Sequence, residues 1–330
     1  MSSRIAYVDV MRGLCMLLVM LGHSLPMNPI NVTILSFHML AFYFISGYCY
    51  KSSGANIWTR LKNKALNLGW LLLTFSFMSI LLNYAYLLIG KGQNVPLWQA
   101  LIGSFYSDGI IGVSLTSGFW FVRELFFISL IYIVLEKFVG RYITLLVWTI
   151  IAITIIVIPL EFYMSNEIGR TALGGAFYSL GAIWRKDGGK IESTINNKST
   201  YLIIGLSLLV TTSIIAQYNS PVLIYCFEYG IIYLFLTTAL LGSFSIYGIS
   251  RYITSNRILE FVGKNSISYL FIHFYIKEIF IFIVRDTYSE KAWFIVALYL
   301  TILLVSTLFC IIINKYFPWV AKFPYQQNLK

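Results

Sequence analysis

The feature that most constrains this chain is a series of long apolar blocks that carry almost no charge. Spanning the hydrocarbon core of a bilayer takes about 20 mostly apolar residues, so such blocks are typical of transmembrane helices. Only 11% of the 330 residues are charged, whereas a soluble domain has roughly 25%. So few charges cannot cover the surface of a soluble protein of this size. The sequence therefore predicts an all-α, polytopic membrane helix bundle.

The same composition excludes several other classes of protein. The apolar blocks argue against a soluble enzyme, a disordered chain, a secreted disulfide scaffold and a nucleic-acid binder, and an outer-membrane barrel would alternate apolar and polar residues. We attribute the net charge of +11 to basic cytoplasmic loops rather than to an acidic partner. The four cysteines have no metal-like spacing, so we expect them to pack and expect no metal site: Cys15, Cys49, Cys226 and Cys310.

We expect one membrane domain over residues 1–330, with no appended soluble domain and no internal repeat. The first block contains Asp9 and Arg12 and lacks a convincing cleavage site, so we expect it to remain as a helix. The blocks predict about ten spans: Ile5–Leu25, Val32–Tyr50, Leu66–Ile89, Gly118–Leu135, Tyr142–Leu160, Thr171–Trp184, Tyr201–Ala216, Pro221–Phe244, Asn265–Val284 and Ala292–Asn314.

The distribution of basic residues predicts the orientation of these spans. With the N-terminus inside, the inner segments carry 17 of the 24 Lys and Arg residues. Cytoplasmic loops are enriched in basic residues, so both termini should be cytoplasmic and the number of spans even. The outer loops carry only 4, namely Lys91, Arg170, Arg285 and Lys291, and the other three fall within spans, namely Arg12, Arg123 and Lys277.

The first span carries three ionisable residues on nearly one face. Arg12 and His23 are eleven residues apart, which is close to three helical turns and roughly 16 Å along the axis. Asp9 lies three residues before Arg12, on nearly the same face. This stripe suits a donor with an anionic head group inside and an acceptor outside. The alternative is that Asp9 and Arg12 form an ion pair between helices and His23 sits at the outer interface.

Two further spans carry charges near their predicted outer ends. Arg123 and Glu124 are neighbours in sequence, so they point to different helix faces and cannot both meet the same partner. Alternatively, Arg123 extends to the membrane interface. We place Glu228 on the eighth span, where it is protonated, paired to a cation such as Arg123, or bound to substrate.

Small polar residues and histidines mark the second and ninth spans. Ser46 and Gly47 favour a close helix contact. His38 lies at the outer turn of the second span, where it is either an interface residue or part of the site. His273 falls near mid-membrane in the ninth span, where the alternative to a functional role is a buried histidine bonded to another helix.

Four motifs in this chain resemble those of the membrane acyltransferase-3 family, including its fucose 4-O-acetylase-like members. They occur in the family's order, with its ten-helix layout, although Leu40 follows Met39 where the family often has proline. The motifs are Asp9-Val-Met-Arg12-Gly13 with His23; Phe37-His38-Met39 to Phe44-Ile45-Ser46-Gly47-Tyr48; Phe119-Trp120-Phe121-Val122-Arg123-Glu124-Leu125; and Gly263-Lys264-Asn265-Ser266 to Tyr269 and His273.

The resemblance implies an integral-membrane O-acyltransferase of the bacterial inner membrane. Its donor would be cytoplasmic acyl-coenzyme A, usually acetyl-coenzyme A. Its acceptor would be a hydroxyl of a cell-surface or exported carbohydrate, either a polysaccharide unit or a lipid-linked sugar. No metal is implied, and membrane lipid would surround the protein. The residues carried over from the family motifs are Arg12, His23, Ser46, Gly47, Arg123, Glu124 and His273.

These residues suggest a mechanism in which His23 is the general base that takes the proton from the sugar hydroxyl. Asp9 is about 21 Å further along the same helix, so the residue that orients His23 must come from another helix, with Glu228 or Glu124 as candidates. Arg123 would stabilise the oxyanion or bind an acceptor carboxylate. We thus assign two groups of residues: His23, Glu228, Arg123 and Glu124 as catalytic, and Arg12, Asp9, Ser46 and His273 as donor-binding.

Two other function classes remain open at this point. A transporter or flippase for a sugar or lipid-linked saccharide would also place charges within many helices, but would bind no acyl-coenzyme A. A sensing membrane protein would show neither transport nor transfer. The sequence specifies neither the acyl group and the acceptor hydroxyl nor the oligomeric state, and it allows either direct transfer or an acylated His or Ser.

Overall fold

The computed structural model of the chain describes residues 5–51, 55–88, 92–103, 105, 120–158, 165–195, 197–284 and 291–321. Within these ranges the secondary structure is helical except for one isolated β-bridge. The helices are α1 Ala6–Ser24, α2 Pro29–Leu35, α3 His38–Tyr48, α4 Ile57–Leu88, α5 Leu97–Gly103, α6 Trp120–Val139, α7 Arg141–Val157, α8 Ser165–Asp187, α9 Gly189–Glu192, α10 Lys198–Ala216, a 3-10 turn Ile224–Cys226, α11 Ile232–Ile253, α12 Arg257–Lys264, α13 Ser266–Val284, α14 Ala292–Tyr316 and α15 Pro318–Ala321.

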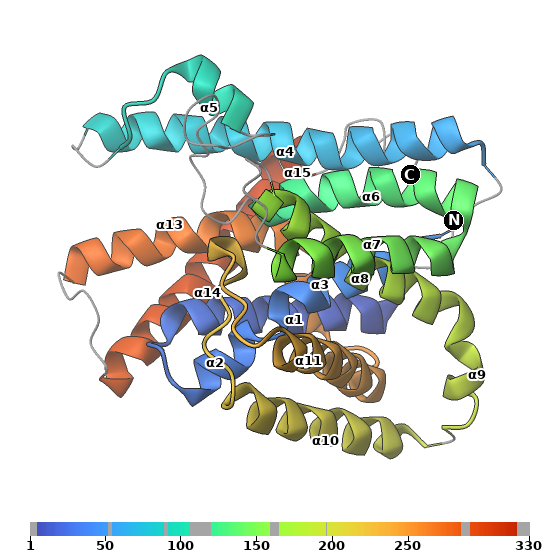
Figure 1. Cartoon of the computed structure of the whole chain (residues 1–330). Helices are drawn as coiled ribbons and strands as arrows, with labels where there is room; N and C mark the ends of the chain where they lie inside the picture. The colour runs from blue at the N-terminus through green and yellow to red at the C-terminus, as the bar shows by residue number, and fades with distance from the viewer. Residues whose placement is uncertain are drawn as a thin grey trace.

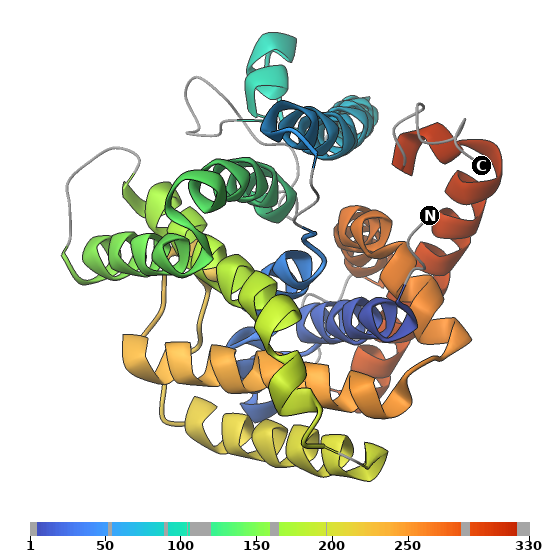
Figure 2. The same cartoon turned by 90° about the vertical axis from the view of Figure 1, so that its right-hand side faces the viewer.

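The helices α1 and α3 occupy the interior of the bundle. In Figures 1 and 2 the other long helices surround them, with α4 along one edge and α10 along the opposite edge. The main packing partners are α3 with α8, α1 with α12, α7 with α8, α10 with α11, and α13 with α14. The first two of the four predicted motifs therefore lie on the most enclosed helices, where their side chains meet other helices.

Seven candidate spans of the described chain are long and apolar enough to cross a membrane: α1, the α2–α3 pair, α4, α10, α11, α13 and α14. The helix α7 is apolar but shorter. Two more predicted spans, α6 and α8, form helices that carry several charged residues. The all-α, multi-pass architecture is thus confirmed, whereas a count of ten spans and cytoplasmic termini stay predictions.

The second predicted span, Val32–Tyr50, is not one continuous helix. Its first part starts at Pro29, after Asn28, whose side chain accepts a hydrogen bond from the Asn31 amide. The helix then breaks at Ser36 and Phe37, where the Ser36 hydroxyl donates to the Thr33 carbonyl at 2.8 Å. Such local side-chain bonds compete with the helical pattern. The break places His38 at the first turn of α3.

The eighth predicted span, Pro221–Phe244, was wrong over almost its first half, residues 221–231. The chain there forms a loop closed by a bridge between Leu223 and Glu228, and α11 starts only at Ile232. Gly230 has a φ of 60° and a Cβ there would lie 2.3 Å from the Asn219 side chain, so the turn depends on glycine. Glu228 is therefore an exposed loop residue and not a helical one.

The sixth span begins earlier than predicted. We expected Thr171–Trp184 with Arg170 in an outer loop, but α8 starts at Ser165 and Arg170 lies within it, only 2% exposed. A carboxylate on α6 makes this burial possible, as described below. The predicted bounds Ile89, Gly118 and Leu160, and the motif residue Phe119, lie outside the described residues.

The helices α3 and α8 cross in direct backbone contact at two glycines. A Cβ at Gly47 would lie 1.8 Å from the Tyr178 carbonyl oxygen, and one at Gly181 would lie 2.0 Å from the Phe44 carbonyl oxygen. Small residues allow this close approach between membrane helices. The predicted close contact at Gly47 is thus confirmed. Gly13 and Gly263 form the same kind of reciprocal contact between α1 and α12.

Gly47→Ala should destabilise the folded protein by about 1–3 kcal/mol, because the added methyl group forces α3 away from α8. The matched control is Gly69→Ala in α4, where a Cβ would make an ordinary 3.5 Å contact with Phe126 and alanine favours the helix. Thermal unfolding in detergent, followed by size-exclusion chromatography, measures both. Equal unfolding midpoints for the two variants would contradict the crossing geometry.

Candidate functional site

A cavity of about 220 Å³ enters the bundle between α1, α3, α4, α6 and the α12–α13 junction. Cationic and polar residues line the end that the sequence places at the cytoplasm, where Lys264 and Asn314 are exposed. Apolar residues line the rest. The lining includes Arg12, Ser46, Cys49, Lys64, Lys264, Asn265 and Asn314 at the polar end, and Met16, Met39, Phe42, Leu68, Phe121, Leu125 and Leu270 further in.

Arg12 is the cation that projects into the cavity from α1. Its guanidinium lies 3.5 Å from the Asp9 carboxylate and donates to the Cys49 sulfur at 3.1 Å. Asp9 is 1% exposed and does not line the cavity. Asp9 therefore orients Arg12 within α1. The sequence also allowed an ion pair between helices, but the pair that Asp9 and Arg12 form lies within one helix.

Lys264 and Glu260 form an exposed pair at the cavity mouth. The Lys264 Nζ lies 2.8 Å from the Glu260 carboxylate, and this hydrogen bond lowers the pKa of the Glu260 carboxyl. Ser255 donates a second hydrogen bond to the same group. Since α12 lies outside the long spans, this pair is in reach of cytoplasmic anions in the predicted orientation. Lys264 keeps two further N–H groups for such a ligand.

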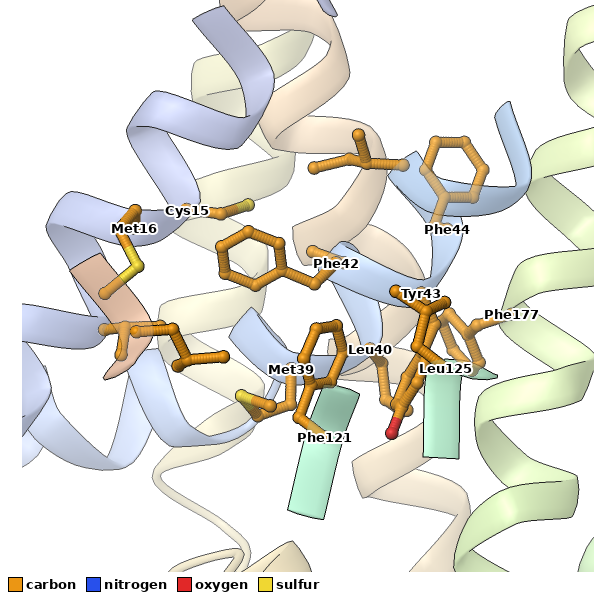
Figure 3. Packing of buried hydrophobic residues seen from close by; sticks show 14 of the residues in the cluster. Cys15, Met16, Met39, Leu40, Phe42, Tyr43, Phe44, Phe121, Leu125 and Phe177 are labelled. Carbon is orange, nitrogen blue, oxygen red and sulfur yellow. The ribbon is translucent and has the colours of Figure 1, made fainter. Parts of the chain in front are cut away.

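The inner end of the cavity approaches the histidines. Met39 follows His38 in α3, Leu270 lies about one turn before His273 in α13, and Met16 is about 10 Å along α1 from His23. Figure 3 shows Met39 and Phe42 beside Phe121, with Met16 of α1 on one side and Phe177 on the other. The cavity lining therefore includes neighbours of the histidines along α3 and α13, whereas the three histidines themselves do not line it.

All three histidines of the chain belong to this region, and we call them the histidine group: His23, His38 and His273. The rings of His23 and His273 have centroids 5.2 Å apart, and both contact Phe274. The His38 Nδ1–H donates to the Ile34 carbonyl oxygen at 2.7 Å, since a carbonyl oxygen only accepts. His23 is half-buried and the other two are buried.

A second polar cluster, the buried charge network, lies between α3, α6 and α8. Arg170 donates through Nε to one Glu124 oxygen, and the Tyr43 hydroxyl donates to the other at 2.6 Å. Arg123 pairs instead with Glu167, at 3.1 Å. The prediction that Arg123 and Glu124 meet different partners is thus confirmed. Arg123 is 7% exposed, so it does not extend to the membrane surface.

Aromatic rings and a loop carbonyl enclose Arg170. Its guanidinium lies 4.8 Å from the centre of the Trp120 ring and 4.7 Å from that of Phe227, and it donates to the Tyr225 carbonyl at 3.2 Å. Cations bind favourably over aromatic faces. The loop that replaced the start of the eighth span is therefore held against α8 by this arginine.

The structure brings some predicted site residues together and separates others. Arg12 and Ser46 share the cavity, and the Ser46 hydroxyl donates to the Phe42 carbonyl at 2.8 Å. His23 and His273 are ring neighbours. Glu228 stands apart in its exposed loop and forms no ion pair with any described residue.

Several residues of these clusters were not identified from the sequence. Glu167 and Arg170 are spaced by three and precede the sixth predicted span, which is the one weak signal for the network. Tyr43, Cys49 and Lys64 carry no signal, because nothing local distinguishes them from the many tyrosines and basic residues of the chain. Their roles depend on which helices pack together.

One comparison with known proteins finds a match. A family model described as an acyltransferase domain, that of the acyltransferase-3 family, matches residues 5–315. This range contains both clusters and the cavity. No curated protein and no solved structure matches the chain.

Arg170→Met should destabilise the protein by about 3–5 kcal/mol, because it leaves the buried Glu124 carboxylate without its cation. Adding Glu124→Gln should recover part of this loss. The control is Arg141→Met, which breaks an exposed pair with Asp187 and should cost about 0–1 kcal/mol. Unfolding midpoints in one detergent compare the variants. Equal effects of the two arginine substitutions would contradict the network.

Proposed function

Because this chain belongs to the acyltransferase-3 family of membrane acyltransferases, we propose that it moves an acetyl or other short acyl group from cytoplasmic acyl-coenzyme A to a carbohydrate hydroxyl. The acceptor is a polysaccharide unit or lipid-linked sugar at the outer side of a bacterial inner membrane. The supporting observation is a cavity lined by Arg12 and Lys264 and also by Met39 and Leu270, which lie within a helical turn of His38 and His273. Such a cavity lets a donor and an acceptor meet from opposite sides of the membrane.

The donor is held at the polar end of this cavity. Arg12, Lys64 and Lys264 supply positive charge for the phosphates of acyl-coenzyme A, and phosphate prefers Arg and Lys donors. The pantetheine arm extends past Ser46 and along the apolar lining. Arg12 and His23 are roughly 16 Å apart by helical rise, a separation that the long arm bridges. The thioester carbonyl then lies beside the histidines.

His23 acts as the general base in the transfer. The acceptor hydroxyl oxygen attacks the thioester carbonyl while its proton passes to the free nitrogen of His23. The carbon–sulfur bond then breaks, and the proton moves from His23 to the thiolate of coenzyme A. The products are an acyl ester of the carbohydrate and free coenzyme A, so atoms and charge balance without an acyl-enzyme.

The charged residues of α6 support this site indirectly. Glu124 and Arg123 are already paired within the bundle, so in our proposal they fix α3, α6 and α8 around the cavity. Glu228 is exposed in the loop beside Tyr225, where its carboxylate accepts hydrogen bonds from acceptor hydroxyls. We assign neither the Glu124 nor the Glu228 carboxylate as the partner of His23.

His23→Ala should lower transfer from radiolabelled acetyl-coenzyme A by at least about 10²-fold, because the hydroxyl loses its base. Purified protein in liposomes is assayed with added glycan and for slow hydrolysis of the donor. Cys226→Ser, in the exposed loop, is the control and should retain wild-type activity. Retained turnover in His23→Ala would overturn the base assignment. A folded wild type that binds no acetyl-coenzyme A would instead favour the transporter.

Acetyl-coenzyme A should protect Cys49 from maleimide labelling, because the thiol lines the cavity beside Arg12. The experiment uses a variant that retains only Cys49, and a matched variant that retains only the exposed Cys226. Saturating donor should slow labelling of Cys49 several-fold and leave Cys226 unaffected. Equal labelling rates of Cys49 with and without donor would place the donor elsewhere.

A further inference from the structure

We infer that His273 is a positioning residue that accepts the N–H of His23 and so selects which His23 nitrogen takes the proton. This inference rests on the proposed function, since it assigns the partner of the proposed base. His273 comes from α13 and faces His23 of α1, with ring centroids 5.2 Å apart and an angle of 37° between the ring planes. The sequence required such a partner from another helix.

The hydrogen bond at the other side of the ring fixes the tautomer of neutral His273. Its Nδ1 lies 3.0 Å from the Tyr269 carbonyl oxygen. A carbonyl oxygen only accepts, so Nδ1 carries the hydrogen and Nε2 presents a lone pair. The carbonyl belongs to the preceding turn of the same helix, so this orientation holds wherever α13 is formed.

The Nε2 atom of His273 is a buried acceptor that lacks a donor. His273 is 0% exposed, and no described residue bonds this atom. A buried polar atom without a partner is destabilising, because it has lost its hydrogen bonds to water and gained none in the protein. An N–H group that donates a hydrogen bond to this atom is therefore more stabilising than one that donates to a solvated acceptor. A buried lone pair beside the proposed base is the observation that carries the inference.

His23 is the group placed to supply that donor. Its ring is half-buried, and within the described chain neither of its nitrogens has a hydrogen bond. Phe274 contacts both rings, at 4.5 Å and 4.3 Å between centroids, and limits how they move. The centroid separation of 5.2 Å is short enough for a His23 nitrogen to come within hydrogen-bond distance of His273 Nε2 when the His23 ring turns toward it.

Other candidate partners for His23 are engaged or distant from it in the fold. Glu124 is bonded to Arg170 and Tyr43, and Glu228 lies in the exposed loop. The remaining titratable groups near His23 are His38 on α3 and Lys277 on α13. Lys277 has only N–H donors. His38 also keeps a lone pair at Nε2, but among the described residues the histidine ring in contact with His23 is that of His273.

This contact has a defined chemical consequence. Neutral His23 has one N–H, and when it donates that hydrogen to His273 its other nitrogen keeps the lone pair for the acceptor hydroxyl. After proton transfer the imidazolium retains the same hydrogen bond, so His273 also stabilises the charged form of His23. His273 itself neither gains nor loses a proton.

The test compares His273→Leu, His273→Gln and a matched control, Ser306→Ala, in the acetyl transfer assay across pH. Leucine removes the hydrogen-bond acceptor of His273, whereas the amide oxygen of glutamine restores a hydrogen-bond acceptor near the position of Nε2. Ser306 is a buried hydroxyl without a partner on the adjacent α14, so its removal alters packing without touching the histidines. Folding of each variant is checked by size-exclusion chromatography.

We expect His273→Leu to lose about 10²-fold in kcat, with little change in the KM for acetyl-coenzyme A. The acid limb of its pH–rate profile should move to lower pH, because the His23 imidazolium loses the hydrogen-bond acceptor that stabilises it. His273→Gln should recover most of the rate, and Ser306→Ala should keep the wild-type profile. A folded His273→Leu with an unshifted acid limb, or a His273→Gln as slow as His273→Leu, would overturn the inference. An inactive wild type would instead count against the proposed function itself.

Discussion

The buried ion pair between Arg170 and Glu124 is the interaction on which the arrangement of the bundle depends. In a hydrocarbon surrounding, an unpaired charge at these positions is costly, so α6 and α8 are held where the two side chains meet. The Tyr43 hydroxyl of α3 donates a hydrogen bond to Glu124, so α3 is held by the same pair. Arg170 also donates a hydrogen bond to the loop that precedes α11. None of the residues of this network lines the cavity, so the network fixes the helices that form the cavity walls without being part of its lining.

The direct backbone crossings complete this arrangement. At Gly47 the helix α3 touches α8, and at Gly13 the helix α1 touches α12. Both contacts bring polar motif residues into the interior, because α1 carries Arg12 and His23 while α3 carries Ser46. A bundle with ordinary helix spacing would hold the same residues further apart and leave them without a shared cavity.

The two ends of the site differ in chemistry. Cations and amides line one part of the cavity and apolar side chains line the rest, while His23 and His273 are in ring contact on α1 and α13. This polarity matches a donor with an anionic head, a long arm and a reactive thioester. In the proposed function, the donor and the acceptor approach one base from opposite sides of the membrane.

Most of the helices follow from the sequence, because a long apolar segment in a bilayer satisfies its backbone hydrogen bonds within itself by forming a helix. Residue spacing within one helix was equally informative. It predicted correctly that Asp9 lies beside Arg12 and that Arg123 and Glu124 pair with different residues. Two errors occurred where local hydrogen bonds interrupted an apolar stretch, at Ser36 and in the loop around Glu228. A third was the expected outer-loop position of Arg170, which is buried in α8 because it pairs with Glu124.

The sequence by itself determined the helical membrane architecture, the family and the stripe that joins Arg12 to His23. Tertiary structure alone decided that Arg170 lies inside the bundle, that Cys49 shares the cavity with Arg12, and that the ring beside His23 belongs to His273. Hydropathy and periodicity describe one helix at a time. Partners across helices depend on crossing positions, and these are set by small residues and buried charges that are far apart in the chain.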